Sequence, residues 1–265
     1  MNIIKDNDML LSYIPNVVSA VEGESDLYTK LLPHLALAES WFYRKVCKQI
    51  ALQSSEDAMS LARTIVATEA FRAAIPSLNV ILTANGFGIV SNQTTAPASK
   101  ERTESLIEAL VEQRDNAIEQ LAFCLSGKHL QFANTIFQGF EAQRMQGFSS
   151  HLFDHLIEQR SAVVRSQTTL AEDVLSEEVL KDMVAATYAD ETSRSAGIAF
   201  LFAYVPSIII KQLKGEDCKN DIRRVVEYLR THPEYFPQWE QSHAAKHWQD
   251  YTYKNDKKSG GFWLW

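Results

Sequence analysis

Two pairs of histidines in this chain have a spacing that places both side chains on one face of a helix. His151 and His155 are four residues apart, with Asp154 between them. His243 and His247 repeat that spacing in the stretch HAAKH. Imidazoles arranged in this way can bind one metal ion, but neither pair has the glutamate that serves as general base, and the sequence supplies no third ligand. We therefore expect ordinary histidines, no metal and no cofactor, and keep a small metal-dependent enzyme as an alternative.

Other catalytic patterns are missing from the sequence. It contains no G-x-x-x-x-G-K-[ST] loop and no G-x-S-x-G elbow, and its NGFG stretch lacks the third glycine of a dinucleotide loop. Glu177 and Glu178 are neighbours, so they point apart on a helix and are expected to be first-turn charges. The cysteines are far apart and predict reduced thiols: Cys47, Cys124 and Cys218. These patterns predict a protein that is not an enzyme.

The composition is that of an ordinary globular protein. Of 265 residues 46% are hydrophobic, and the formal net charge is -7, so no overall positive field attracts nucleic acid. The N-terminal stretch MNIIKDNDML does not resemble a secretory signal. The most apolar stretch, residues 197–210, is shorter than the roughly 20 residues of a membrane span, and we expect Pro206 to break it. We interpret it as core and expect no membrane contact.

The first half of the chain has apolar residues at helical spacing. This pattern covers residues 26–52 and 56–75, and Pro76 is expected to end the second helix. After a polar stretch, Ser99 is the expected N-cap of a long helix that Gly127 ends. The apolar face of this helix consists of Leu106, Leu110, Ile118, Leu121 and Leu125.

Between these helices the sequence predicts a β-hairpin over residues 78–91. Apolar and β-branched residues flank Asn85-Gly86, a pair that tolerates the positive φ angles of a type I′ turn. An isolated hairpin is only marginally stable in water, so it must pack on the bundle or pair with a neighbouring chain. The candidate oligomer contacts are Asn85, Gly86 and Phe87.

The second half is predicted to be helical again. Helices are expected in FSSHLFDHLIEQR, in SEEVLKDMVAATYADE with Ser176 as cap, in residues 198–213, and in CKNDIRRVVEYLRTH before Pro233. From there the sequence is rich in aromatic and polar residues and predicts an arm with at most a short helix at 241–251. The expected fold is a mostly α helical bundle: residues 1–126 with the hairpin, 127–232 as a second helical subdomain, and 233–265 as an extended C-terminal arm.

The last residues, KNDKKSGGFWLW, are unusually aromatic. Aromatic side chains are common interface anchors, and basic residues among aromatics can also bind single-stranded nucleic acid. Docking on a partner protein, packing on the same domain and nucleic-acid binding are therefore all open, and docking is favoured. The candidate partner-binding residues are Tyr251, Tyr253, Phe262, Trp263, Leu264 and Trp265.

The stretch from Ala74 to Leu125 resembles an uncharacterised protein family in Bacteroidales genomes and in their phages and prophages. The resemblance is carried by the GFGIVSN strand, by the APASKER helix start and by Pro76 upstream of them. That family lies among virion structural genes. The resemblance therefore implies a structural protein of a phage particle and brings no catalytic residues with it.

The predicted arrangement is also similar to that of the adaptor proteins that form a ring beneath the phage portal. Those proteins are helical bundles with a hairpin or loop facing the ring and a C-terminal arm that inserts into the portal. The likeness implies a head-tail connector in a cyclic homo-oligomer, such as a dodecamer, whose tail binds the portal or a neighbouring neck protein. Its location would be the virion, assembled in the bacterial host cytoplasm. Another tail-completion or neck protein is the alternative.

In such a ring, genomic DNA would pass by without specific binding. The net charge of the chain is -7, and a negative lining repels the phosphate backbone instead of holding it. The sequence thus predicts a protein partner for the tail and no specific nucleic-acid partner for the body.

Overall fold

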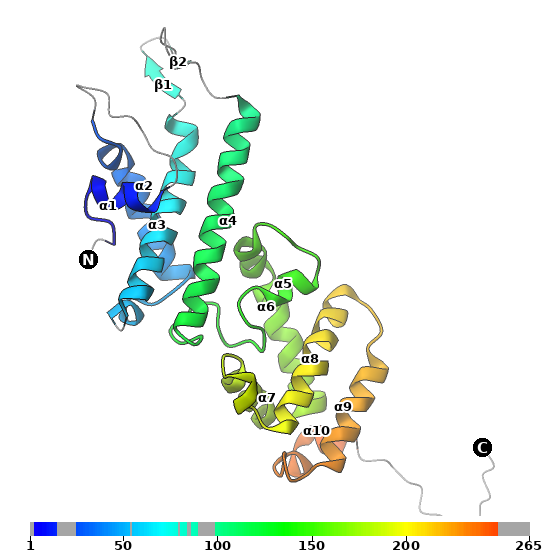
Figure 1. Cartoon of the computed structure of the whole chain (residues 1–265). Coiled ribbons are helices and arrows are strands. Elements are labelled where there is room, and N and C mark those ends of the chain that lie inside the picture. Colours follow the sequence, from blue (N-terminus) through cyan, green and yellow to red (C-terminus); the bar gives the residue numbers. More distant parts are fainter. Residues whose placement is uncertain are drawn as a thin grey trace, which may run out of the picture. The chain divides into compact units, whose positions relative to one another are not determined.

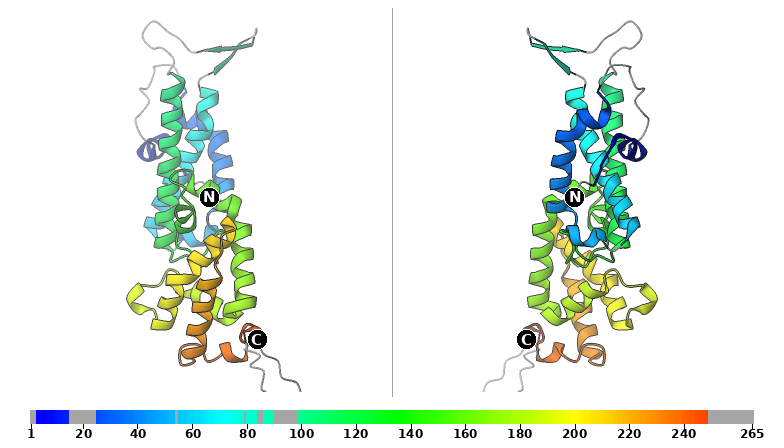
Figure 2. Two further views of the ribbon diagram at one scale, coloured as in Figure 1. Left: turned by 90° about the vertical axis from the view of Figure 1, so that its right-hand side faces the viewer. Right: turned by 90° about the vertical axis from the view of Figure 1, so that its left-hand side faces the viewer.

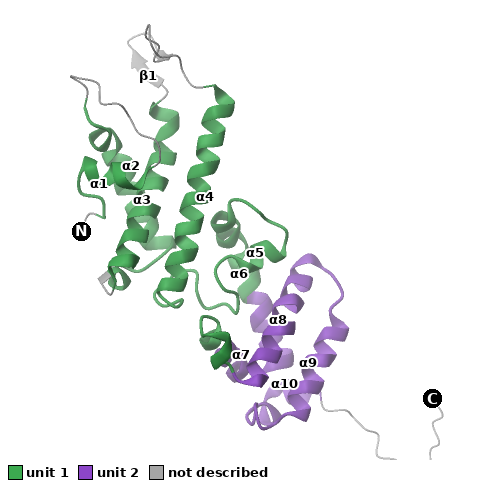
Figure 3. Cartoon of the chain, viewed as in Figure 1, with its two compact units in different colours: residues 1–164, 184–194 green, residues 165–183, 195–265 purple. Residues whose placement is uncertain are grey.

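The computed structural model describes residues 3–14, 25–53, 55–78, 80–83, 86–89 and 99–248, with the backbone alone in 80–83 and 86–89. Contacts divide the chain into two compact units (Figure 3). Unit 1 takes in residues 1–164 and 184–194, and unit 2 takes in 165–183 and 195–265. Both are built mainly from helices, so the prediction of a mostly α protein is confirmed.

Unit 1 is built around α3, which packs between α2 and α4 (Figures 1 and 2). Leucines and isoleucines at helical spacing form the common core, and Phe42, Ile65 and Ile118 are completely buried in it. The short helix α1 packs against α2 and α3. The bounds are α1 Asn7–Tyr13, α2 Leu27–Lys45, the 3-10 helix η1 Gln49–Gln53, α3 Glu56–Leu78, α4 Lys100–Cys124, α5 Glu141–Met145 and α6 Leu152–Leu170, with the 3-10 helix η3 Glu191–Ser193.

The chain after α4 folds back onto this core. The backbone N–H of Lys48 donates to the carbonyl of His129 at 2.9 Å, and that of Gln131 donates to the carbonyl of Val46 at 2.8 Å. Phe140 is fully buried in the same core as the helices of the first half. Residues 127–164 therefore belong to unit 1, and the expected boundary after residue 126 differs from the observed division.

Unit 2 contains the longest apolar helix, α8 (Ala196–Lys214), which passes through Pro206 without a break. The predicted break was wrong because Val205, Ile208 and Ile209 are fully buried on either side, and their packing outweighs the lost hydrogen bond. By length and composition alone, α8 is the one helix of the described chain that could cross a membrane. Core helices of soluble proteins also meet these two criteria, and 39% of the apolar window of α8 is buried in the protein. The other elements are the π-helix η2 Ala171–Leu175, α7 Glu177–Ala186, α9 Lys219–Thr231, the 3-10 helix η4 Trp239–Gln241 and α10 His243–His247.

Of two predicted helix boundaries, the one at Ser99 is confirmed and the one at Pro76 is wrong. Ser99 caps α4 as predicted, since its side chain accepts the N–H of Arg102 at 3.3 Å. Pro76 does not end α3, which continues to Leu78. The proline lies in the last turn, where its missing N–H removes only one bond from a helix that is about to end.

The segment between α3 and α4 contains two short strands, β1 (Val80–Thr83) and β2 (Gly86–Ile89). Their backbones pair antiparallel, with Val80 opposite Ile89 and Thr83 opposite Gly86. Gly86 is therefore a strand residue and not the second turn residue that the sequence suggested. Asn85 and the predicted type I′ turn lie outside the described residues, and the contacts expected of Asn85, Gly86 and Phe87 stay predictions.

The first half of the expected C-terminal arm is folded. Phe236, Trp239 and Ala244 are buried in unit 2, and the described chain continues to Trp248. The extended arm predicted from residue 233 is therefore wrong up to that point, because apolar side chains separated by polar residues form a packed segment here. The short helix predicted at 241–251 corresponds to α10.

A matched pair of glycine substitutions tests the packing after α4. Gly127 has φ +71°, and a Cβ there would lie 2.5 Å from the ring of Tyr188. Gly147 also has a left-handed backbone, yet nothing lies within 4 Å of its Cβ position. We expect Gly147→Ala to cost roughly 1–2 kcal/mol of unfolding free energy, and Gly127→Ala to cost about 1–3 kcal/mol more, measured by denaturant unfolding. Equal losses would show that the ring of Tyr188 does not restrict Gly127.

Candidate functional site

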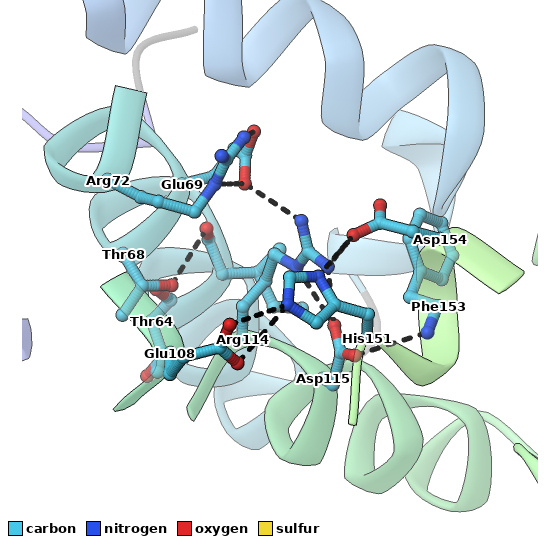
Figure 4. Close-up of polar contacts among 11 residues, drawn as sticks. Thr64, Thr68, Glu69, Arg72, Glu108, Arg114, Asp115, His151, Phe153 and Asp154 are labelled. Atoms are coloured by element: carbon cyan, nitrogen blue, oxygen red, sulfur yellow. Dashed lines mark hydrogen bonds and ion pairs between the residues drawn. The ribbon is translucent and has the colours of Figure 1, made fainter. Parts of the chain in front are cut away.

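The largest fully buried side chain among the described residues is an arginine, Arg114 on α4. Its guanidinium reaches carboxylates on three helices of unit 1 (Figure 4). Nη1 lies 3.0 Å from Oε2 of Glu69 on α3, and Nη2 lies 2.9 Å from Oδ2 of Asp154 on α6. Nε donates to Oδ1 of Asp115 at 2.9 Å. We call Glu69, Arg114, Asp115 and Asp154 the Arg114 cluster.

The carboxylates of the cluster have further partners. Oδ2 of Asp115 accepts the backbone N–H of Phe153 at 3.1 Å, at the start of α6. Glu69 also accepts from Nε and Nη2 of Arg72, at 3.0 and 2.6 Å. Bidentate pairs of this kind fix the position of both partners. The cluster therefore ties α3, α4 and the first turn of α6 together.

Aromatic rings cover the guanidinium. The Cζ atom of Arg114 lies 5.7 Å from the ring centre of Trp41 on α2 and 5.9 Å from that of Phe153. The two rings meet edge to face at 5.5 Å. A cation over ring faces is stabilised, and the ring of Trp41 adds α2 to the same set of contacts.

The electrostatics of the cluster favour fixed charges. Burial opposes the charge of Arg114, but Asp115, Asp154 and Glu69 outweigh it and raise the pKa of Arg114. Burial opposes ionisation of Asp154 too, yet the nearby guanidinium lowers the pKa of that carboxyl. For Asp115 burial prevails and raises the pKa. Because both oxygens of Asp115 are already bonded, this carboxyl positions α6 and is poorly placed to accept a proton from a substrate.

A histidine lies at the edge of the cluster. Nε2 of His151 lies 3.1 Å from Oε1 of Glu108 on α4, and Nδ1 lies 3.5 Å from Oδ2 of Asp154. The hydrogen bond with Glu108 is the main cause that raises the pKa of His151. Protonated His151 thus links an exposed glutamate of α4 to the buried ion pairs.

An open groove of about 730 Å³ runs along α4 beside His151. Its acidic residues recur every three or four positions, which places them on one face of the helix. Arg144 is the one arginine in the lining, and Glu119 neutralises it at 2.5 Å. The acidic residues of this groove are Glu101, Glu104, Glu108, Glu112 and Asp115. Such a surface repels anions and is unsuited to a phosphate group.

The histidine pairs do not form the metal sites that the sequence allowed. His151 precedes α6 with φ +51°, so it does not share a helix with His155. The ring of His155 stacks on Phe148 with centres 3.9 Å apart. His243 and His247 are the first and last residues of α10. Within the described ranges, no three His, Cys, Asp or Glu side chains gather closely enough to hold a metal ion.

The candidate partner-binding residues of the tail lie outside the part of the chain that the structure describes. These are Tyr251, Tyr253, Phe262, Trp263, Leu264 and Trp265. The Arg114 cluster was not predicted from the sequence, although the sequence contains a signal for it. Arg114 stands four residues after Leu110 and four before Ile118, within the apolar stripe of α4. A charge in that position must find partners inside the protein.

Replacing Arg114 tests its role in stability. Arg114→Met leaves three carboxylates without their shared counter-charge, so we expect a loss of about 3–5 kcal/mol in unfolding free energy, measured by urea denaturation. Arg72→Met is the matched control, because Arg72 is partly exposed and pairs with Glu69 on its own helix. Its loss should stay below about 1 kcal/mol. Equal losses for the two variants would contradict a central role for Arg114.

The raised pKa of His151 predicts a pH dependence. The folded chain binds the proton more tightly than the unfolded chain, so the added stability is complete below the unfolded pKa and is lost as the pH rises through the folded pKa. We expect unfolding free energy to fall as the pH rises past about 6.5, the ordinary histidine pKa, and this slope to flatten in His151→Gln. Glu108→Gln, which removes the main partner, should flatten the same slope. An unchanged slope in both variants would exclude this pair as its source.

Comparison with known proteins assigns the chain to a family. No curated protein and no solved structure matches the chain. One family model matches residues 23–139 and 210–248, which together are more than half of the chain. The first segment contains Glu69, Arg114 and Asp115, whereas Asp154 lies between the two segments. The chain therefore belongs to the family described as "Family of unknown function (DUF6712)".

Proposed function

We propose that this protein is a structural subunit of a phage or phage-derived particle. Its role is that of a head-tail connector, or adaptor, which forms a ring and docks on the portal through its C-terminal aromatic residues. The observation that carries the proposal is the Arg114 cluster. Its charges, most of them buried, bond to one another and to the start of α6, which suits a rigid scaffold better than a reaction centre.

The position of the segment 79–99 adds support. It connects the two long helices α3 and α4, and α4 is fixed to α3 by the ion pair between Arg114 and Glu69. The two helices therefore fix where this segment begins, after Leu78, and where it ends, at Ser99. The resemblance of residues 74–125 to a family among virion structural genes falls on this same segment. The hairpin contacts of Asn85, Gly86 and Phe87 belong to the proposal.

The acidic face of α4 favours passage of DNA over binding of DNA. Four glutamates of one helix face line the groove, and Arg144 and His151 there are paired with Glu119 and Glu108. Closely spaced carboxylates repel a phosphate backbone. In the proposed ring, such a face reduces non-specific sticking of the genome. The protein would act in the virion after assembly in the host cytoplasm, without cofactor, metal or membrane.

The tail supplies the proposed anchor. Burying each of Phe262, Trp263, Leu264 and Trp265 contributes roughly 1.5–3 kcal/mol before ordering costs are subtracted. Ser259, Gly260 and Gly261 precede them and provide reach. A second candidate, another neck or tail-completion protein, shares the scaffold and differs only in its neighbour. None of the described side chains specifically favours the metal-dependent enzyme.

Binding to the portal protein of the same genome tests the docking. We expect deletion of residues 261–265 from the full chain to weaken binding at least tenfold, or about 1.4 kcal/mol, measured by biolayer interferometry on assembled portal rings. Leu37→Ala is the control, because it removes an apolar side chain that is 69% exposed on α2 and outside the proposed contact. Equal binding of the deletion variant and the intact chain would refute docking through the tail.

A further inference from the structure

The junction between α6 and α7 has an unusual backbone. The π-helix η2 (Ala171–Leu175) ends in a hydrogen bond of 2.8 Å from the N–H of Ser176 to the carbonyl of Ala171. Ser176 has φ +80° and ψ 157°, a region that glycine alone adopts readily, and it is only 4% exposed. Its side chain accepts the N–H of Val179 at 3.4 Å and caps α7, as the sequence predicted. A residue in this conformation persists only where its surroundings hold it.

Two tryptophans near the C-terminus bond to this junction. The last carbonyls of a helix have no partner within the helix, and here two of them receive indole N–H groups. Nε1 of Trp239 donates to the carbonyl of Val174 at 2.8 Å, and Nε1 of Trp248 donates to the carbonyl of Asp173 at 2.6 Å. The carbonyl of Trp248 in turn accepts from Nη2 of Arg230 on α9 at 2.5 Å.

Residues 233–248, which we call the strap, are seated closely on unit 2. A Cβ on Gly197 of α8 would lie 2.7 Å from Cβ of Tyr235 and 2.8 Å from Cζ of Phe236, so no larger residue fits there. Ala244 and Ala245 are buried, and α10 contacts η2 directly. The strap thus belongs to the body of unit 2, and Trp248 is its last described contact.

The two tryptophans differ in how firmly they are held. Trp239 is 3% exposed, and its hydrogen bond is buried. Trp248 is half-buried, and its hydrogen bond to Asp173 is exposed. Contacts exposed to water open with less free energy than buried ones, so Trp248 separates from η2 before Trp239 does.

We propose that the strap holds Ser176 in its strained conformation and that the bond between Trp248 and Asp173 is a release point. A partner that binds the segment after Trp248 and draws it away breaks this bond first, and the junction then relaxes. Binding of a partner to the tail is thereby coupled to the conformation of Ser176 at the start of α7. The coupling, though not the strap itself, rests on the proposed docking function.

Hydrogen exchange on the full-length protein tests the strap without any partner. In Trp248→Phe an aromatic ring remains, but the indole N–H and the second ring of the indole are lost, so we expect the amides of Ser176 and Val179 to exchange roughly tenfold faster than in the unmodified chain. Leu37→Ala, which removes an exposed side chain of unit 1, should leave these amides unchanged. Unaltered exchange of these amides in Trp248→Phe would contradict the proposal that the strap holds Ser176.

A second variant tests the strain. Ser176→Gly removes the backbone penalty and one side-chain cap, and glycine substitutes well at both kinds of position. We expect the melting temperature to rise and the additional effect of Trp248→Phe on exchange to shrink. A lower melting temperature, or an undiminished effect of Trp248→Phe, would contradict strain at Ser176.

Addition of portal rings tests the coupling. We expect binding to accelerate exchange at Ser176 and Val179, whereas binding with unchanged exchange would refute the coupling and leave docking intact. If portal rings do not bind, the proposed function and the coupling both fail. The comparison of Trp248→Phe with the unmodified chain still decides whether the strap holds Ser176 in its strained conformation.

Discussion

A guanidinium without water must be surrounded by charge and dipoles of its own protein, and unit 1 depends on that constraint. Arg114 is 2% exposed and meets three carboxylates that come from α3, α4 and α6. Desolvation of these groups is costly, so the cluster is stable only when all its members are in place. The position of each helix is thereby tied to that of the others. The acidic groove lies along α4, and His151 in its lining joins Glu108 of the groove to Asp154 of the cluster.

The sequence predicts local structure well where one chemical feature decides it. Apolar spacing gives the helices, and the side chains of Ser99 and Ser176 give two of their caps. The helix predictions that failed concern prolines, whose effect depends on the structure around them. Pro206 lies within α8 because the isoleucines around it are buried, and Pro76 lies within α3 because little of the helix remains after it. Local rules for proline take into account neither the burial of neighbouring side chains nor the distance to the end of the helix.

The candidate site was harder to predict than the helices. A single arginine in an apolar stripe signals a buried charge, but its partners Glu69 and Asp154 are 45 and 40 residues away in the chain. No spacing rule connects them. The strap shows the same limit, because the hydrogen bond from Trp239 to Val174 spans 65 residues. Its sequence, with prolines and scattered aromatics, resembles that of an arm, and its contacts with η2 and α8 make it part of the body.

Together these features describe units whose elements are held in place by buried side-chain contacts, and the proposed function adds a short terminal segment for binding. The ion pairs of unit 1 and the strap of unit 2 hold positions, and neither presents a group prepared for catalysis among the residues described. The most direct test is the copy number and position of the chain in purified particles, determined by cryo-electron microscopy. The account predicts a closed ring, twelvefold for an adaptor, in contact with the portal. A sixfold ring on the tail side would favour the other neck protein, and absence of the chain from the particle would contradict the account.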